Sequence, residues 1–163
     1  MLVPFEQLSD QSKVWIYATQ APFTRDQIDC ITHELKAFTA NWQAHGADLK
    51  ASFEIKYNHF IVIGVDEEHH APSGCSIDKS VQVIKNIESK LNIDLMNRMV
   101  VYVLEGDSVQ IIKSKDIPAA IERGSLHTDS QVFDNTITGM VKYRTHWISS
   151  AQSTWLNRYF TLV

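Results

Sequence analysis

The chain has 163 residues, of which 44% are hydrophobic and 21% are charged, and its formal net charge is −4. These values are typical of one globular domain, 1–163, and the acidic balance gives no general attraction to nucleic acid or anionic lipid. The first residues lack a secretory signal pattern and no apolar run is long enough to span a bilayer, so we expect no membrane partner. Since the only cysteines are Cys30 and Cys75, we expect a cytoplasmic protein.

Strands and helices alternate along the first part of the chain. Residues 13–19 (KVWIYAT) are apolar on both faces, which indicates an interior strand. Thr24 opens a capping-box pattern, and apolar residues at spacings of three and four predict a helix from there to Gly46. Residues 50–57 alternate between polar and apolar, as an edge strand does. The continuous apolar run 60–65 (FIVIGV) then predicts a buried strand.

The second part of the chain begins with another helix. An apolar stripe predicts it from about Ser76, and two runs, 99–105 and 108–113, follow as a hairpin around a Gly-Asp turn. The remaining elements are weaker. They are predicted as one short helix and two strands, at 117–123, 132–137 and 140–145.

The order of the first four strands and two helices is βαββαβ, which is typical of ferredoxin-like domains. We therefore predict an α+β fold with a ferredoxin-like core over about 13–113, an added hairpin strand at 108–113, and a C-terminal αββ extension over about 114–163. Strands 13–19 and 60–65 should be neighbours, and both long helices should lie on one face of the sheet. The other face needs a cover, which either the aromatic tail or a second copy in a homodimer could provide.

The end of the chain is basic and aromatic. No acidic residue follows Asp134. The cations beyond it are Lys142, Arg144 and Arg158. Basic and aromatic residues together can bind nucleic acid, but three cations are few for that purpose. We therefore expect the tail to dock on the acidic body of the protein, with Trp147 and Trp155 largely buried.

In a βαββαβ domain, the end of the first helix and the loop after the third strand lie at the same pole. Here that loop, 66–78, leads into the second helix, and Cys75 stands at the positive end of that helix, where an anion or a thiolate is favoured. His45 is predicted in the last turn of the first helix and should lie nearby. The candidate ligand-binding residues at this pole are Trp42, Asp66, Ser73, Gly74, Ser76 and Asp78.

Two functions fit this pole. The first is a non-enzymatic domain that binds a small anionic ligand or a protein partner. The second is a thiol-dependent enzyme in which Cys75 is the nucleophile, His45 is the base, and Asp66 or Asp78 orients the base. The serines at the pole also fit an ordinary role as helix caps, and Cys75 and His45 fit roles in packing and at a helix end.

Motifs for other chemistries are absent from the sequence. Residues 66–70 (DEEHH) are acidic and histidine residues, which suggest a metal site. Neighbouring side chains in an extended loop diverge, however, so they would rarely bind one ion together. No H-E-x-x-H, paired C-x-x-C or EF-hand spacing supports such a site. The nucleotide-binding patterns G-x-x-x-x-G-K-[ST] and G-x-G-x-x-G and the hydrolase pattern G-x-S-x-G are also missing. We therefore expect no metal and no cofactor.

Several segments, taken together, resemble one protein family. They are LVPFEQLSDQSKVWIY, W-x-x-H-G (Trp42, His45 and Gly46), LKASFEIKYNHF, SGCSID, VFDN and STW-x-x-R, and they span nearly the whole chain. The family that they resemble is an uncharacterised group of small bacterial proteins, often labelled "ABC transporter ATPase". The residues do not support that label, because the phosphate-binding loop, the magnesium-site carboxylate and an LSGGQ-like signature are missing. The resemblance therefore implies a family but no activity.

Overall fold

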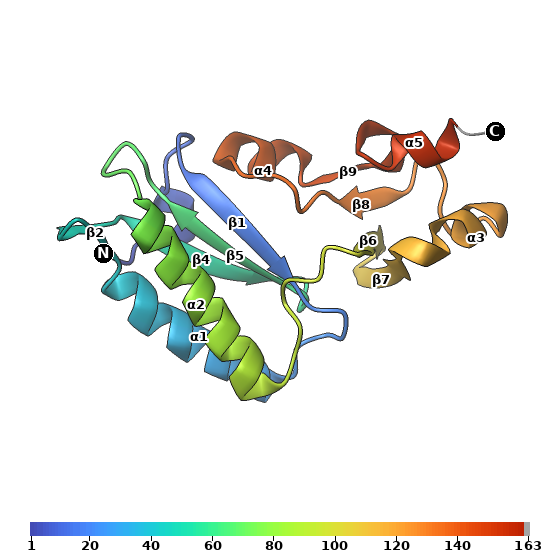
Figure 1. The fold of residues 1–163 in the computed structure, drawn as a ribbon. Coiled ribbons are helices and arrows are strands. Elements are labelled where there is room, and N and C mark those ends of the chain that lie inside the picture. Colours follow the sequence, from blue (N-terminus) through green and yellow to red (C-terminus); the bar gives the residue numbers. More distant parts are fainter. Residues whose placement is uncertain (162–163) are drawn as a thin grey trace.

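The computed structural model describes residues 1–161. Its N-terminal part is a three-stranded antiparallel sheet, here called the first sheet, with two long helices on one face (Figure 1). In spatial order its strands are β1 (Lys13–Ala18), β5 (Phe60–Val65) and β4 (Ala51–Lys56). The helices are α1 (Arg25–Ala40) and α2 (Gly74–Leu91). The predicted neighbouring strands and the predicted shared face of the helices are confirmed.

Both long helices begin at reciprocal capping pairs. The Thr24 hydroxyl accepts a hydrogen bond from the Gln27 N–H at 3.2 Å, and the Gln27 side chain accepts one from the Thr24 N–H at 3.0 Å. Ser73 and Ser76 form the same kind of pair at the start of α2. These contacts satisfy N–H groups that have no partner within the helix, so they fix where each helix starts.

The first helix ends earlier than the sequence predicts. After α1 the chain forms a small hairpin whose strands are β2 (Gln43–Ala44) and β3 (Ala47–Asp48). His45 and Gly46 are its turn, with φ angles of 51° and 78°. The prediction that His45 lies in the last turn of the helix is therefore wrong. A glycine after the apolar stripe looked like a helix stop, but here it serves a hairpin turn that needs two positive φ angles.

The C-terminal part holds a second antiparallel sheet, with the order β7-β6-β8-β9. Its strands are β6 (Val100–Glu105), β7 (Ser108–Lys113), β8 (Gln131–Phe133) and β9 (Ile148–Ser150). The helices of this part are α3 (Ile117–Glu122), α4 (Met140–His146) and α5 (Asn157–Phe160). Short 3₁₀ turns lie at Phe5–Gln7, Ser114–Asp116 and Ala151–Ser153. Figure 1 shows the second sheet to the right of the first, with α3 and α5 at its far end.

The fourth strand of the predicted ferredoxin-like sheet does not join the first sheet. β6 pairs with β7 and β8, so the predicted hairpin is present, but β6 does not lie beside β1, where the fourth strand of a ferredoxin-like sheet would lie. Loops hold the outer edge of β1 instead. The Val14 N–H donates to the Thr138 carbonyl at 2.9 Å. The Ala18 N–H donates to the Leu95 carbonyl at 3.1 Å. An apolar pattern shows that β6 is interior, but it does not select the neighbouring strand.

Part of the C-terminal extension also differs from the prediction. The strand predicted at 132–137 is present in part as β8, whereas residues 140–145 lie in the helix α4 and the last strand is β9. Met140, Tyr143 and Trp147 recur at spacings of three and four, so one helical face buries all three. These side chains pack with Phe60 of β5 on the open face of the first sheet. The tail therefore covers the face opposite the long helices.

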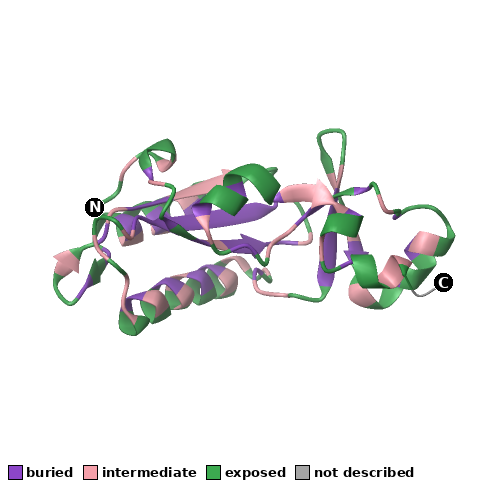
Figure 2. Ribbon diagram, turned by 90° about the horizontal axis from the view of Figure 1, so that it is seen from above, coloured by how far each residue is buried: buried purple, intermediate pink, exposed green. Residues whose placement is uncertain are grey.

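The two tail tryptophans have different environments. Trp147 is 5% exposed, as predicted, whereas Trp155 is 40% exposed and the prediction of its burial is wrong. Figure 2 shows the buried residues along the strands, and exposed or intermediate residues over most of the C-terminal end.

Candidate functional site

Trp42 is a structural link at the predicted pole. Its side chain is buried, with the residue 1% exposed, and its Nε1–H donates to the Ser76 carbonyl in α2 at 2.8 Å. The rings of Trp15 and Phe38 pack against it. The indole thus holds the start of α2 beside the β2–β3 hairpin. Because the indole N–H is its single polar group, Trp42 has no polar capacity left for a ligand.

Ser73 and Ser76 cap the start of α2 by hydrogen-bonding to each other. Besides their reciprocal pair, the Ser76 hydroxyl donates to the Ser73 carbonyl at 2.8 Å. Gly74, Cys75 and Asp78 are exposed. The structure therefore brings the predicted residues of this helix start together with Trp42, and the contacts among them fix the helix.

Asp66 is the centre of a buried polar network. Its side chain is 3% exposed and lies 3.0 Å from the Lys50 ammonium group. Ser9 donates to it through its hydroxyl at 2.7 Å and its N–H at 3.3 Å, and the Glu68 N–H donates at 3.0 Å. Burial alone would raise the pKa of Asp66, but these hydrogen bonds outweigh it and lower the pKa to about 2. The carboxylate joins the N-terminal segment, the start of β4 and the loop after β5.

Cys75 and His45 are exposed on different elements, Cys75 in the first turn of α2 and His45 in the β2–β3 turn. Among the hydrogen bonds of residues 1–161, none involves either side chain. The thiol–imidazole pair therefore stays a prediction from the sequence.

We expect His45→Ala to leave the alkylation rate of Cys75 unchanged, because no hydrogen bond joins the imidazole to the thiol among residues 1–161. The measurement is the rate of iodoacetamide labelling at Cys75 from neutral to alkaline pH, in a background of Cys30→Ser and followed by mass spectrometry. A rate that falls about tenfold or more in the His45 variant would instead support a nucleophile–base pair.

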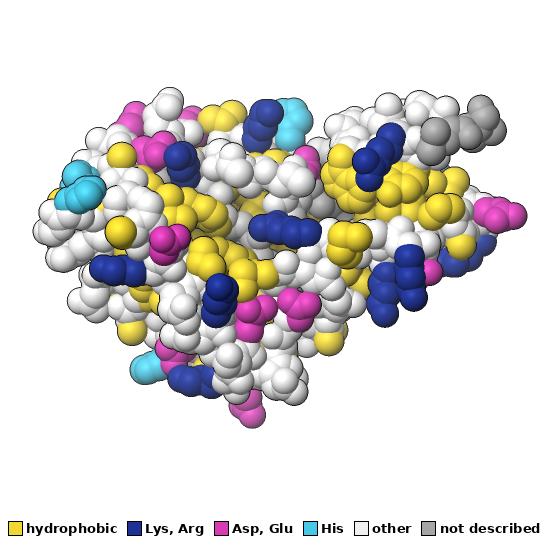
Figure 3. All heavy atoms as spheres, in the orientation of Figure 1, with side chains coloured by type: hydrophobic (Ala, Val, Ile, Leu, Met, Phe, Trp, Pro, Cys, Tyr) yellow, Lys and Arg dark blue, Asp and Glu magenta, His cyan; other side chains and the backbone are white. Residues whose placement is uncertain are grey.

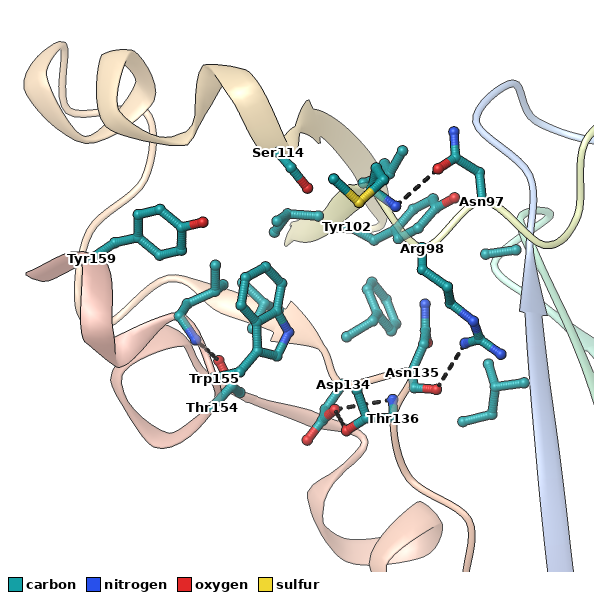
Figure 4. Close-up of a pocket in the computed structure, with 18 of the residues that line it drawn as sticks. Asn97, Arg98, Tyr102, Ser114, Asp134, Asn135, Thr136, Thr154, Trp155 and Tyr159 are labelled. Atoms are coloured by element: carbon teal, nitrogen blue, oxygen red, sulfur yellow. Dashed lines mark hydrogen bonds between the residues drawn. The ribbon is translucent and has the colours of Figure 1, made fainter.

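A cavity of about 290 Å³ lies between the outer edge of β1 and the second sheet, beside the edge that the predicted fourth strand would have taken (Figure 4). Ile16 and Ala18 line it from β1, and residues 97–102 line a second side. Residues 154–156, with Arg158 and Tyr159, line a third. Ligand pockets typically measure about 300–1,000 Å³. The displacement of β6 into the second sheet thus leaves a space near the lower end of that range.

Tyr102 on β6 lines this cavity and carries a buried hydroxyl. The residue is 2% exposed, and within residues 1–161 its hydroxyl has no hydrogen-bond partner. Burial, helped by the Asp94 carboxylate, raises the pKa of Tyr102 to about 12, although Arg98 opposes the shift. The hydroxyl is therefore a proton donor at neutral pH. Native proteins keep few such groups, because an unpaired buried hydroxyl costs about 1–3 kcal/mol.

The lining of the cavity is positively charged. Arg98 and Arg158 line it, and neither forms an ion pair with a carboxylate among residues 1–161. Arg98 donates to the Asn135 carbonyl at 3.3 Å. Asp134, the carboxylate in the described lining, accepts hydrogen bonds from the N–H and the hydroxyl of Thr136. Two unpaired cations thus face one carboxylate that is already engaged, in a chain of net charge −4.

Exposed hydrophobic side chains flank the cavity. Met99 is 66% exposed and Trp155 is 40% exposed, and both belong to the lining. The Arg158 guanidinium lies over the rings of Trp155 and Tyr159, 5.6 Å and 5.1 Å from their centroids. Figure 3 shows hydrophobic side chains gathered over this C-terminal part, with basic side chains beside them. The exposure of Trp155 is therefore a feature of the cavity.

Sequence reasoning missed this site, although part of it leaves a signal. The basic and aromatic tail contains Trp155, Arg158 and Tyr159, but its composition predicts docking on the body and not a cavity. Arg98 and Tyr102 lie at the entry and in the middle of an ordinary apolar strand, so their pattern alone does not distinguish them from structural residues.

Comparisons with protein-family models, with curated proteins and with solved structures found no match. The resemblance to a bacterial family therefore stays an expectation from the sequence. Over residues 1–161, no helix combines the length and the apolar character that crossing a membrane requires. In the same residues, no three His, Cys, Asp or Glu side chains are grouped so that they could hold a metal ion.

Proposed function

We propose that the protein binds a small anionic molecule in the cavity between its two sheets. The observation that carries this proposal is that Tyr102, which lines the cavity, has a buried hydroxyl without a hydrogen-bond partner among residues 1–161. Arg98 and Arg158 support an anion, because guanidinium groups form strong charge-assisted hydrogen bonds with oxyanions. The two free cysteines are consistent with the cytoplasmic location that we include in this proposal.

The proposal moves the anionic ligand away from the pole at which the sequence suggested it. At that pole, the polar groups of Trp42, Asp66 and Ser76 already bond to other parts of the protein. At the cavity, the Tyr102 hydroxyl has no hydrogen-bond partner among residues 1–161, and the Arg98 guanidinium donates to the Asn135 carbonyl alone. A protein partner or a thiol-dependent reaction at the pole has no comparable support, and the alkylation experiment above addresses the second of these.

The anionic dye 1-anilinonaphthalene-8-sulfonate (ANS) tests the proposal, because its fluorescence rises in accessible apolar sites. We expect saturable binding of one dye molecule per chain. Arg98→Gln should weaken this binding about tenfold, since it removes one charge-assisted hydrogen bond. Arg123→Gln is the matched control, because Arg123 lies outside the cavity and donates to Ser125.

A blocked cavity provides the second arm of this test. Ser114 lines the cavity, and Figure 4 shows its hydroxyl directed toward the open space, so Ser114→Trp should abolish dye binding. Ser108→Trp, at an exposed position of β7 outside the lining, should leave dye binding intact. Equal binding of the dye to the wild type and Ser114→Trp, or no binding to the wild type, would overturn the proposal.

A further inference from the structure

We infer, as a step that rests on the proposed function, that the ligand is a flat aromatic monocarboxylate, with its ring against Trp155 and its carboxylate on Arg98 and Tyr102. The ring, the acidic group and the single charge each follow from a different part of the cavity.

Aromatic side chains form much of the lining. They are Tyr102, Phe133, Trp155 and Tyr159. Tyr102 and Phe133 pack on Phe60 in the core, whereas Trp155 has one ring neighbour among residues 1–161. That neighbour is Tyr159, which meets the indole edge-on, with an interplanar angle of 73°.

The indole of Trp155 is placed to contact a ligand. Figure 4 shows it extending from the C-terminal segment into the space between Tyr159 and Tyr102. The Arg158 guanidinium lies over the indole, but no aromatic ring of the described chain stacks face to face on it. A flat ring can take that position, and stacking on an indole favours aromatic ligands over saturated chains.

The other end of the cavity presents donors. Figure 4 shows Tyr102 and Arg98 on the side of the cavity away from Trp155, with the Arg98 guanidinium directed toward Asn135. A protonated phenol and a guanidinium can only donate hydrogen bonds to an anion at neutral pH. A carboxylate matches them, because its oxygens accept from the planar guanidinium in a paired geometry and retain capacity for the phenol.

A backbone group on β1 adds a third donor. In an antiparallel strand, N–H groups alternate between the two edges, so those of Val14, Ile16 and Ala18 all face the outer edge of β1. Val14 and Ala18 donate to loop carbonyls, but no acceptor within residues 1–161 takes the Ile16 N–H. Ile16 also lines the cavity. The missing fourth strand would have supplied the acceptor, and a ligand oxygen can replace it.

The charge balance favours one negative charge on the ligand. Arg98 and Arg158 bring two positive charges to the lining and Asp134 brings one negative charge. The lining residues therefore carry one net positive charge. A phosphate monoester is largely dianionic at neutral pH, so it exceeds that charge. A monocarboxylate matches it.

Displacement of ANS tests this ligand class with four defined compounds. Indole-3-acetate has the ring and the carboxylate, and indole-3-acetamide has the same ring without the charge. Decanoate has as many carbon atoms and a carboxylate but no ring, and inorganic phosphate has the higher charge. We expect indole-3-acetate to bind about tenfold more tightly than each of the other three.

Trp155 variants identify the ring contact. Trp155→Leu should weaken indole-3-acetate about tenfold and leave decanoate unchanged, because leucine keeps an apolar surface without a stacking face. Trp155→Phe should restore most of the affinity for indole-3-acetate. Dye affinity is measured separately for each variant, so that the displacement constants are comparable.

The outcomes separate this inference from the proposed function on which it rests. If any of the three comparison compounds binds as tightly as indole-3-acetate, or if Trp155→Leu weakens indole-3-acetate and decanoate equally, the aromatic monocarboxylate is overturned. The proposed function then still stands on the response of the dye to Arg98→Gln and Ser114→Trp. If the dye itself does not respond to those two variants, both are overturned.

Discussion

Replacing Tyr102 with Phe is expected to stabilise the protein and to weaken ligand binding at the same time. The Tyr102 hydroxyl is buried without a partner, so removing it while keeping the ring should raise the free energy of unfolding by about 1 kcal/mol. The same change removes a protein hydroxyl that would donate a hydrogen bond to the ligand, so indole-3-acetate should bind about tenfold more weakly. Urea unfolding followed by circular dichroism measures the first effect, and dye displacement measures the second.

Tyr143 provides the matched control, because its buried hydroxyl has a partner. It donates to the Glu54 carboxylate, and burial together with that hydrogen bond raises the pKa of Tyr143 well above its usual range. Tyr143→Phe should therefore lower the free energy of unfolding by about 1.5–3 kcal/mol, since it leaves the Glu54 carboxylate unpaired. Tyr143 lies outside the cavity lining, so ligand affinity should not change.

The opposite signs of these two variants make the expectation specific. Two buried tyrosines lose the same atom, and whether the protein gains or loses stability depends on the partner of the hydroxyl. A Tyr102→Phe protein that is less stable than the wild type would mean that the hydroxyl is satisfied within the protein. In that case the main support for a ligand in this cavity would be lost. A gain in stability coupled to a loss of binding is expected where function retains an unfavourable group.

The elements that short segments determine could be predicted from the sequence. The start of α1 follows from the capping residue Thr24, whose partner lies three residues further on, whereas α2 begins at Gly74, two residues before the start predicted at about Ser76. The strand 60–65 is apolar at every position, and the structure buries all of it. Contacts within a few residues, or burial on both faces, leave a direct trace in the pattern.

The partners of the strands could not be predicted in the same way. β6 is apolar enough to be interior in either sheet. The N–H groups at the outer edge of β1 donate to the carbonyls of Thr138 and Leu95, which carry no pairing signal in the sequence. The spacing of Met140 and Tyr143 fits a helix, but over so short a segment it is compatible with a strand as well. The cavity is harder still, because Arg98, Tyr102 and Trp155 come together only after both sheets are in place.

Acid is expected to destabilise the protein through Asp66, and Asp66→Asn should remove most of that sensitivity. In the folded protein the pKa of Asp66 is lowered to about 2, against an ordinary value of 3.8. A carboxyl group whose pKa is lower in the folded state stabilises that state above its unfolded pKa, and the contribution is lost as the pH falls through the folded pKa. The difference corresponds to about 2 kcal/mol, lost mainly between about pH 4 and pH 2.

At neutral pH, Asp66→Asn should lower the free energy of unfolding by about 3 kcal/mol, because it leaves Lys50 without its buried partner and weakens the bonds from Ser9. Glu67→Gln is the control: Glu67 pairs with Lys13, whose side chain is 51% exposed, and should change stability by less than about 1 kcal/mol. Urea unfolding of all three proteins at several pH values measures the effect. If the wild type and Asp66→Asn lose stability in parallel on acidification, the acid-sensitive group is not Asp66, because a group that has been removed cannot titrate.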